Sequence, residues 1–167
     1  MFKVSLGQDS HRLEERGKGP TPDKVFILGG VEFEEPFYLC GNSDADVLLH
    51  ALTNAISGIT GIPVLGPRAD ALCRLGEVNS QAYLNLALQD LQATGYQICH
   101  LSFSLECLRP KIFPKIDSLR QSLERLLNLE RENIALTATT GEGLTDFGKG
   151  LGIQVLCMLT AIKAQLS

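Results

Sequence analysis

The sequence contains no tryptophan, and only 6% of its 167 residues are aromatic. A platform on which unpaired nucleic-acid bases stack is built from aromatic side chains, so this chain has little from which to make one. A basic excess is also missing, because 15 lysines and arginines stand against 19 acidic residues and the formal net charge is -4. General binding to nucleic acid or to an anionic membrane is therefore not expected.

Long apolar runs are absent as well, since no stretch reaches the roughly 20 residues needed to cross a bilayer. The opening residues, Met1 to Val4, do not resemble a signal peptide. The five cysteines include no C-x-x-C pair of the kind found in zinc or redox sites, and we expect buried, reduced thiols. These features predict a cytoplasmic protein with one domain over residues 1–167.

Hydrophobic periodicity predicts both strands and helices. A mixture in this order favours an α+β fold (an α/β sandwich), with one mixed sheet and helices packed on one face. A long irregular segment, 58–79, is expected to be functional or mobile. Strands are expected at 2–11, 25–28, 31–33, 101–107 and 134–140, and helices at 43–58 with Ser43 as N-cap, at 80–94, at 114–128, and after Gly150 to about Gln165.

Three residues form a candidate metal site. Asp9 and His11 lie two positions apart near the end of the first expected strand, so both side chains should project to the same side. His50 shares a face of the first expected helix with Asp46 and Asn54, opposite the apolar face, and is therefore not expected in the core. One carboxylate and two imidazoles are the ligand set of an open catalytic zinc site.

A D-x-H pair is short and common, so the alternative is that Asp9 and His11 lie in an ordinary loop and His50 is a solvated helix residue. Two features favour the metal site. His11 and His50 are two of only three histidines, and segment 43–46 brings acidic groups beside the expected cation in a helix that does not need both of them. The remaining His100 is interpreted as a structural or surface residue.

A second candidate cluster follows the last expected strand. Thr139 and Thr140 offer hydroxyls, the glycines after them offer free backbone N–H groups, and Glu142 offers a carboxylate. Such a set can hold phosphate oxygens while the carboxylate recruits Mg²⁺. The alternative is an ordinary glycine-rich turn. Lys111 and Lys149 could neutralise phosphate, or they could simply be surface lysines.

Several segments together form a specific pattern across nearly the whole chain. They are Asp9-Ser10-His11, Gly29-Gly30-Val31, the block S-D-x-D-x-x-x-H-A-L-T at 43–53, Pro110-Lys111 and Ala138-Thr139-Thr140-Gly141-Glu142. In order and spacing they resemble the 2-C-methyl-D-erythritol 2,4-cyclodiphosphate synthase family. Members of that family make isoprenoid precursors by the non-mevalonate route, as homotrimers with active sites between adjacent subunits.

The resemblance implies two cation sites. Asp9, His11 and His50 would bind Zn²⁺, and Glu142 would help to hold a second divalent cation, Mg²⁺ or Mn²⁺. It also implies a substrate linked to cytidine diphosphate, whose cytosine would lie against the segment of Pro110. The residues expected to contact this substrate are Asp9, His11, Asn42, Ser43, Gly66, Pro110, Lys111, Thr139, Thr140, Glu142 and Lys149.

The sequence departs from the family pattern at several positions. Asn42 stands where histidine is common, and Asn54 replaces a common aspartate. Lys149 stands where the family usually has a phosphate-contacting arginine, which keeps the charge but loses the bidentate fork. The usual Asp-Ile-Gly appears as Val64-Leu65-Gly66, so the carboxylate expected to bind the ribose hydroxyls is absent, and the stretch 67–79 is unrecognisable.

The implied reaction is intramolecular. The 2-phosphate of 4-diphosphocytidyl-2-C-methyl-D-erythritol 2-phosphate attacks the β-phosphorus, and CMP leaves. No protein nucleophile is needed, because the protein has only to fold the substrate in line and neutralise developing charge. Thr140 is expected to stabilise the transition state, with weaker hydrogen-bonding help from Asn42 than a histidine would give.

Two other functions fit the same residues. The first is a metal-dependent phosphohydrolase, which would use the triad to activate water and would release inorganic phosphate. The second is a trimeric protein that binds cytidine nucleotides or isoprenoid diphosphates without turnover. Ligand-dependent stabilisation without product would identify the second.

Overall fold

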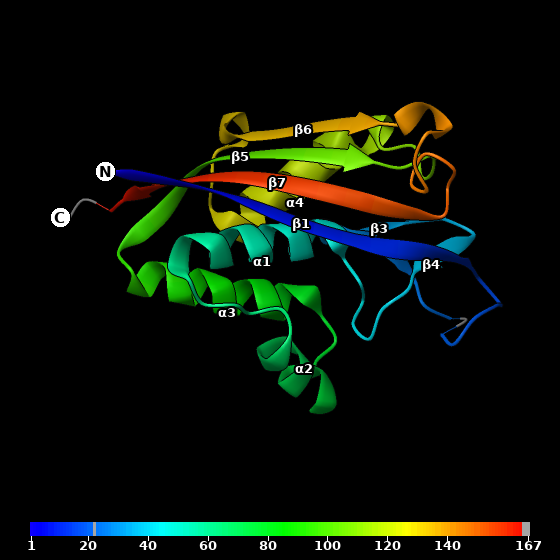
Figure 1. Cartoon of the computed structure of the whole chain (residues 1–167), viewed down its shortest axis with the longest axis horizontal. Coiled ribbons are helices and arrows are strands. Elements are labelled where there is room, and N and C mark those ends of the chain that lie inside the picture. Colours follow the sequence, from blue (N-terminus) through cyan, green and yellow to red (C-terminus); the bar gives the residue numbers. More distant parts are fainter. Residues whose placement is uncertain (22, 165–167) are drawn as a thin grey trace.

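The computed structural model describes residues 1–21 and 23–164 and has a sheet as its framework (Figure 1). The five strands run in the order β4-β1-β7-β5-β6, and only β5 and β6 are parallel, so the sheet is mixed. A short hairpin of β2 and β3 forms a separate two-stranded sheet. The strands are β1 (Phe2–Glu15), β2 (Phe26–Leu28), β3 (Val31–Phe33), β4 (Phe37–Leu39), β5 (Tyr96–Glu106), β6 (Ile134–Thr139) and β7 (Gly152–Lys163).

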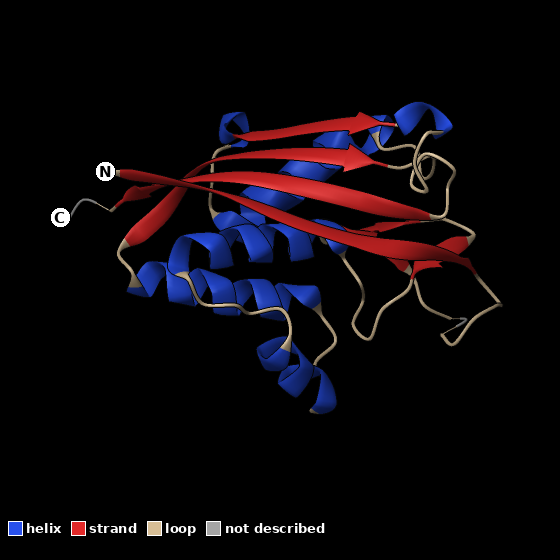
Figure 2. Cartoon of the chain, viewed as in Figure 1, coloured by secondary structure: helices blue, strands red, loops and turns tan. Residues whose placement is uncertain are grey.

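The helices form a second layer on one face of this sheet (Figure 2). Helix α1 lies against β1 and β7, α3 packs beside α1, and α4 lies against β6. This arrangement confirms the predicted α+β fold. The helices are α1 (Val47–Thr60), α2 (Pro67–Arg74), α3 (Ser80–Ala93) and α4 (Ile116–Leu127), with short 3-10 turns at η1 (Phe113–Lys115), η2 (Arg131–Asn133) and η3 (Gly141–Gly143).

Alternation along β1 divides its side chains between two environments. Asp9 and His11 point toward the helices, as the strand period predicts, and so does Gly7. A Cβ atom at Gly7 would overlap backbone atoms of Ala51 and Ala55. The missing side chain therefore lets α1 lie directly on β1, and this contact sets the spacing between the strand and the helix that carry the candidate metal ligands.

The even-numbered side chains of β1 point to the face that the helix layer leaves uncovered. Phe2, Val4 and Leu6 are 70%, 54% and 62% exposed. Their neighbours on β7 continue the apolar surface, because Leu6 pairs with Met158 and Phe2 pairs with Ile162. We call this surface the open sheet face and define it by Phe2, Val4, Leu6, Met158 and Ile162.

The C-terminal segment was expected to be a helix, and that prediction is wrong. Residues 152–163 form β7, which lies between β1 and β5 in the sheet. One side of β7 packs on the core, and the open side also carries apolar residues such as Met158 and Ile162, so the sequence is nearly continuously apolar rather than alternating. Such a run does not distinguish a buried strand from a buried helix. The predicted end near Gln165 lies outside the described residues.

The segment between α1 and α3 was expected to be irregular, but it contains α2. Pro67 occupies the first turn of this helix, where its missing N–H costs nothing. The short edge strand β4 was not predicted either. Among the described residues, none of the helices is both long and apolar enough to span a membrane.

The start of α1 also differs from the prediction. The N-cap is Asp46 rather than Ser43, and its carboxylate accepts the N–H of Leu49 at 3.1 Å. The same carboxylate accepts the N–H groups of Gly29 and Gly30 at 2.8 and 2.7 Å. Asp46 is therefore fully buried and joins α1 to the β2–β3 turn, so it has a structural role instead of adding charge beside a cation.

All five cysteines are free thiols, but the expectation of burial holds only for Cys107 and Cys157. Burial raises the pKa of Cys107 to about 11, which keeps it protonated and unreactive near neutral pH. The other three, Cys40, Cys73 and Cys99, are partly exposed.

Candidate metal centre

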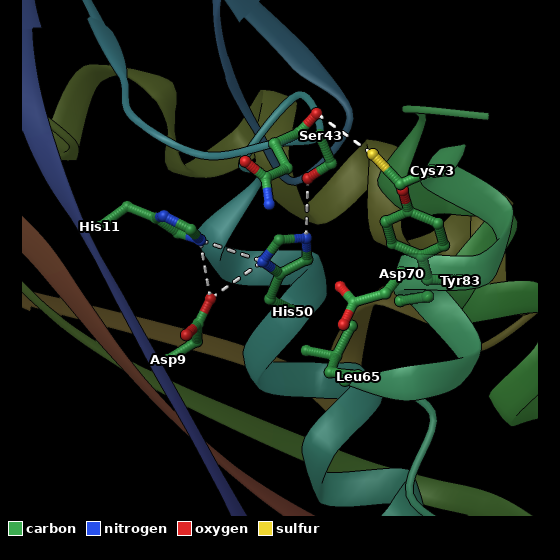
Figure 3. A pocket seen from close by; sticks show the side chains of 11 residues that line it. Asp9, His11, Ser43, His50, Leu65, Asp70, Cys73 and Tyr83 are labelled. Carbon is green, nitrogen blue, oxygen red and sulfur yellow. Dashed lines mark hydrogen bonds and ion pairs between the residues drawn. The ribbon is translucent and has the colours of Figure 1, made fainter. Parts of the chain in front are cut away.

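Asp9 and His11 of β1 meet His50 of α1 at a single point (Figure 3). Oδ2 of Asp9 lies 3.1 Å from Nε2 of His11 and 2.9 Å from Nδ1 of His50. The two ring nitrogens lie 3.1 Å apart. The sequence prediction that these three side chains converge is confirmed, and together they form a candidate metal-binding triad.

The outer contacts of the two histidines show which nitrogen is available to a metal. Nδ1 of His11 lies 2.6 Å from the carbonyl oxygen of Cys40. Because a carbonyl oxygen only accepts hydrogen bonds, Nδ1 of His11 carries the proton and Nε2 presents its lone pair to the triad. Nε2 of His50 faces away from the other two ligands, so Nδ1 is the nitrogen of His50 turned toward them.

The charge of Asp9 completes the donor set. Burial acts to raise the pKa of Asp9, but hydrogen bonds from protonated His11 and His50 and the positive charge of those rings outweigh burial, so the pKa of Asp9 lies below its ordinary value. A bound metal would take the place of those protons. Asp9 is thus an ionised carboxylate facing two imidazole nitrogens. An anionic oxygen and two nitrogen donors at one point suit a divalent cation such as zinc, and the residues therefore fit the metal site predicted from the sequence.

His50 is less exposed than expected. Only 7% of its surface is accessible, although it was predicted to lie on the polar face of its helix and outside the core. The ring is enclosed by Asp9 and His11 of β1, by Ser43 before the helix, and by Ser80 and Tyr83 of α3. Helix periodicity identified the face correctly, but the elements that cover that face come from distant parts of the chain. Asn54, one turn further on, donates from Nδ2 to the carbonyl oxygen of Gln8 at 3.0 Å.

The triad borders an open cavity of about 230 Å³. Two further hollows, of about 490 and 690 Å³, share Asn42 with this cavity and adjoin it. The residues that line the cavity beside the triad are Asp9, His11, Asn42, Ser43, His50, Leu65, Gly66, Ala69, Asp70, Cys73 and Tyr83.

Five of these lining residues were missed by the sequence prediction, and three of them carry polar side chains. Asp70 and Cys73 come from α2, and Tyr83 comes from α3. The signal that could have found the first two is the spacing of Ala69, Asp70 and Cys73, which places them on one face of a helix. The predicted contacts Asn42, Ser43 and Gly66 do line the cavity.

The other predicted site residues lie elsewhere on the chain. Thr139 pairs with Glu106 of β5, which pairs with Gln154 of β7, which pairs with Ser10 of β1. Three strand spacings amount to about 14 Å. Thr139 also points to the face of the sheet opposite Asp9. The remaining members of this group are likewise not among the residues that line the cavity; they are Pro110, Lys111, Thr140, Glu142 and Lys149.

Most of these residues are nevertheless accessible to a ligand from outside the chain. Thr139, Thr140 and Glu142 are exposed at the end of β6. Lys111 is also exposed, whereas Pro110 is buried. The amine of Lys149 lies 3.6 Å from a carboxylate oxygen of Asp146, and both side chains are largely exposed.

A model of the YgbB family matches residues 2–162, which is nearly the whole chain. The chain belongs to the YgbB family. Curated relatives include the 2-C-methyl-D-erythritol 2,4-cyclodiphosphate synthases of Chlamydia abortus, 41% identical over 98% of this chain and 90% of the relative, and of Chlamydia caviae, 41% identical over 96% and 89%. The family membership inferred from the sequence motifs is confirmed.

Solved structures of YgbB-type enzymes share the fold. A CDP-bound form of 2C-methyl-D-erythritol-2,4-cyclodiphosphate synthase is 32% identical, covers 96% of this chain and 100% of that one, and has a TM-score of 0.81. The bifunctional IspDF of Campylobacter jejuni is 26% identical, with a TM-score of 0.83 over 96% of this chain and 42% of that one. The chain thus corresponds to one part of that longer enzyme.

The geometry of the triad predicts that His50→Ala strongly weakens divalent-metal binding. Loss of a direct ligand should lower affinity by more than the roughly 10–100-fold typical of outer-sphere changes. Metal content of the purified variant, measured by mass spectrometry, should fall to background. His100→Ala removes the histidine outside the triad and should leave the content unchanged. Equal metal content in His50→Ala and wild type would contradict the assignment.

Proposed function

We propose that this chain is a cyclodiphosphate synthase, a metal-dependent phosphorus–oxygen lyase of the non-mevalonate isoprenoid route. It would convert 4-diphosphocytidyl-2-C-methyl-D-erythritol 2-phosphate to 2-C-methyl-D-erythritol 2,4-cyclodiphosphate and CMP. The convergence of Asp9, His11 and His50 beside an open cavity carries this proposal. Curated relatives named for this activity, and a CDP-bound enzyme of the same fold, support it. Five free thiols agree with a reducing cytoplasm.

The triad would hold Zn²⁺, which favours nitrogen ligands together with a carboxylate. The ion would supply positive charge for a phosphate oxygen of the substrate. Around it, Asn42 and Ser43 line the cavity and would orient that phosphate by hydrogen bonds. Because the reaction joins two groups of one molecule, these residues have to hold the substrate in line rather than attack it.

The remaining residues of the site would come from a neighbouring copy of the chain. Thr139, Thr140 and Glu142 are exposed but are not among the residues that line the cavity. A second copy could bring them over the triad of the first, with Lys111 and Lys149 near the phosphates and Glu142 on Mg²⁺ or Mn²⁺. The distance of about three strand spacings between Thr139 and the triad supports a site completed in this way.

The open sheet face is the surface through which such copies would associate. Its apolar side chains are 38–70% exposed and contiguous across β1 and β7. Contiguous exposed apolar surface commonly marks a protein–protein interface. We propose a homotrimer, in which three sheets turn this face toward a common axis. In a closed ring each copy gives one half of a site to one neighbour and the other half to the second.

Asp70 is the residue proposed to meet the ribose. The position of the family aspartate is held by Val64, which is fully buried. Asp70 projects into the cavity from α2 (Figure 3). Apart from the triad, it is the only charged side chain among the described residues that line this cavity. A carboxylate can accept hydrogen bonds from both hydroxyls of a ribose.

The direct test is to incubate metal-loaded protein with the substrate and to follow the products by phosphorus NMR. CMP and the cyclic diphosphate should appear in equal amounts. Release of inorganic phosphate would identify a phosphohydrolase instead. CDP-dependent thermal stabilisation without either product would identify a binding protein.

A subunit-mixing experiment tests the composite site. His50→Ala and Glu142→Ala should each be nearly inactive, because each lacks one half of every site. Refolding the two together should restore about one quarter of wild-type activity, since a quarter of the sites then combine two intact halves. Light scattering should report three chains per particle. Activity that stays at the level of the separate variants would place both residues in one chain's site.

The proposed role of Asp70 predicts a specific change in ligand discrimination. Wild type should bind CDP about tenfold or more tightly than 2′,3′-dideoxy-CDP, because hydrogen bonds to a charged group contribute about 1.5–3 kcal/mol. Calorimetry of Asp70→Ala should show this difference reduced to less than about threefold. Asp117→Ala, on α4, should keep the wild-type difference. Undiminished discrimination in Asp70→Ala would remove Asp70 from the ribose site.

A further inference from the structure

We infer that Ser80 and Asp44 form a positioning pair that holds His50 with Nδ1 directed at the metal. The observation is a buried hydrogen-bonded chain running from the imidazole through the Ser80 hydroxyl to the Asp44 carboxylate. The inference deepens the proposed metal centre and rests on it. Neither residue lines the cavity beside the triad, so their effect would pass through His50.

The chain of contacts is short and buried. Oγ of Ser80 lies 2.8 Å from Nε2 of His50, and Ser80 is fully buried. The same hydroxyl is hydrogen-bonded to Oδ1 of Asp44. The other carboxylate oxygen, Oδ2 of Asp44, accepts the backbone N–H of Ser80 at 3.0 Å. Asp44 thus holds Ser80 by two hydrogen bonds, and this fixes where the hydroxyl can point.

The direction of each hydrogen bond follows from the groups present. A carboxylate only accepts, so the single hydroxyl proton of Ser80 is donated to Asp44. Oγ of Ser80 is left with lone pairs, and Nε2 of His50 must therefore donate its N–H to it. The proton of the neutral imidazole is then on Nε2, and Nδ1 faces Asp9 and His11 as a free donor of electrons to a metal.

Ser43 offers a second hydroxyl to His50, but it is a poorer partner. Its Oγ lies 3.5 Å from Nε2 of His50, at the limit of a hydrogen bond, and it already accepts the N–H of Ala45 at 3.1 Å. The shorter contact with Ser80 therefore dominates the orientation of the ring.

The positioning pair is anchored in an element that supplies no metal ligand. Ser80 is the first residue of α3, whose first N–H donates to Asp44 and whose dipole favours the charge of Asp44. The backbone N–H of Asp44 donates to the carbonyl oxygen of Val78 at 2.8 Å, just before that helix. The start of α3 and the loop before α1 are thus joined, and together they hold the outer side of the His50 ring.

The test compares metal affinity in Ser80→Ala and Ser80→Thr, by competition with a chromogenic chelator. Ser80→Ala removes the acceptor for Nε2–H and should weaken Zn²⁺ binding about 10–100-fold. Ser80→Thr keeps the hydroxyl and should recover at least part of the loss. The Zn²⁺ affinity of Asp44→Asn should lie between those of wild type and Ser80→Ala, because an amide in place of the carboxylate can change the direction in which Ser80 donates its hydroxyl proton. Ser122→Ala, at a buried serine of α4, is the matched control.

A spectroscopic readout separates positioning from a general loss of structure. The visible spectrum of the Co²⁺-loaded protein reports the ligand geometry and should change in Ser80→Ala but not in Ser122→Ala, while both keep the wild-type circular dichroism. Wild-type affinity and spectrum in Ser80→Ala would overturn the inference and leave the metal centre intact. If Ser80→Ala weakens metal binding but wild type forms no CMP, the proposed reaction fails while the positioning pair stands.

Discussion

Mutual repulsion among electron-pair donors is the constraint around which this molecule is organised. A carboxylate oxygen and two ring nitrogens lie 2.9–3.1 Å from one another, partly or wholly shielded from water. Their lone pairs oppose such an approach unless a positive charge stands between them. The fold holds them together through the glycine contact between β1 and α1, the carbonyl oxygen behind His11, and the serine and carboxylate behind His50.

The ligand triad could be predicted from the sequence because each part has a local signature. The period of a strand places Asp9 and His11 on one side, and the motif around His50 is specific to the family. The burial of His50 could not be predicted in the same way. It depends on α3, which brings Ser80 and Tyr83 against the ring from 30 and 33 positions later in the chain.

For the rest of the chain, some predictions from the sequence were right and others were wrong, for different physical reasons. The fold class followed from the mixture of periodicities, but β7 was mistaken for a helix because apolar residues lie on both of its faces, which removes the alternation from its sequence. Helix α2 was missed because its segment had lost the family pattern, although the spacing of Ala69, Asp70 and Cys73 was readable. The distance of Thr139 from the triad follows from strand order, which local sequence does not encode.

The contact at Gly7 has a consequence for how the ion site can evolve. At Gly7 the backbone of α1 rests directly on the backbone of β1. No side chain lies between them that could change rotamer and so alter their separation. The distance between the two elements that carry the metal ligands is therefore fixed. A seat of fixed width would favour cations of one radius, and exchange of apolar residues in distant parts of the interior would leave that preference intact. Selectivity would then reside in main-chain geometry at a residue that offers the ion no ligand.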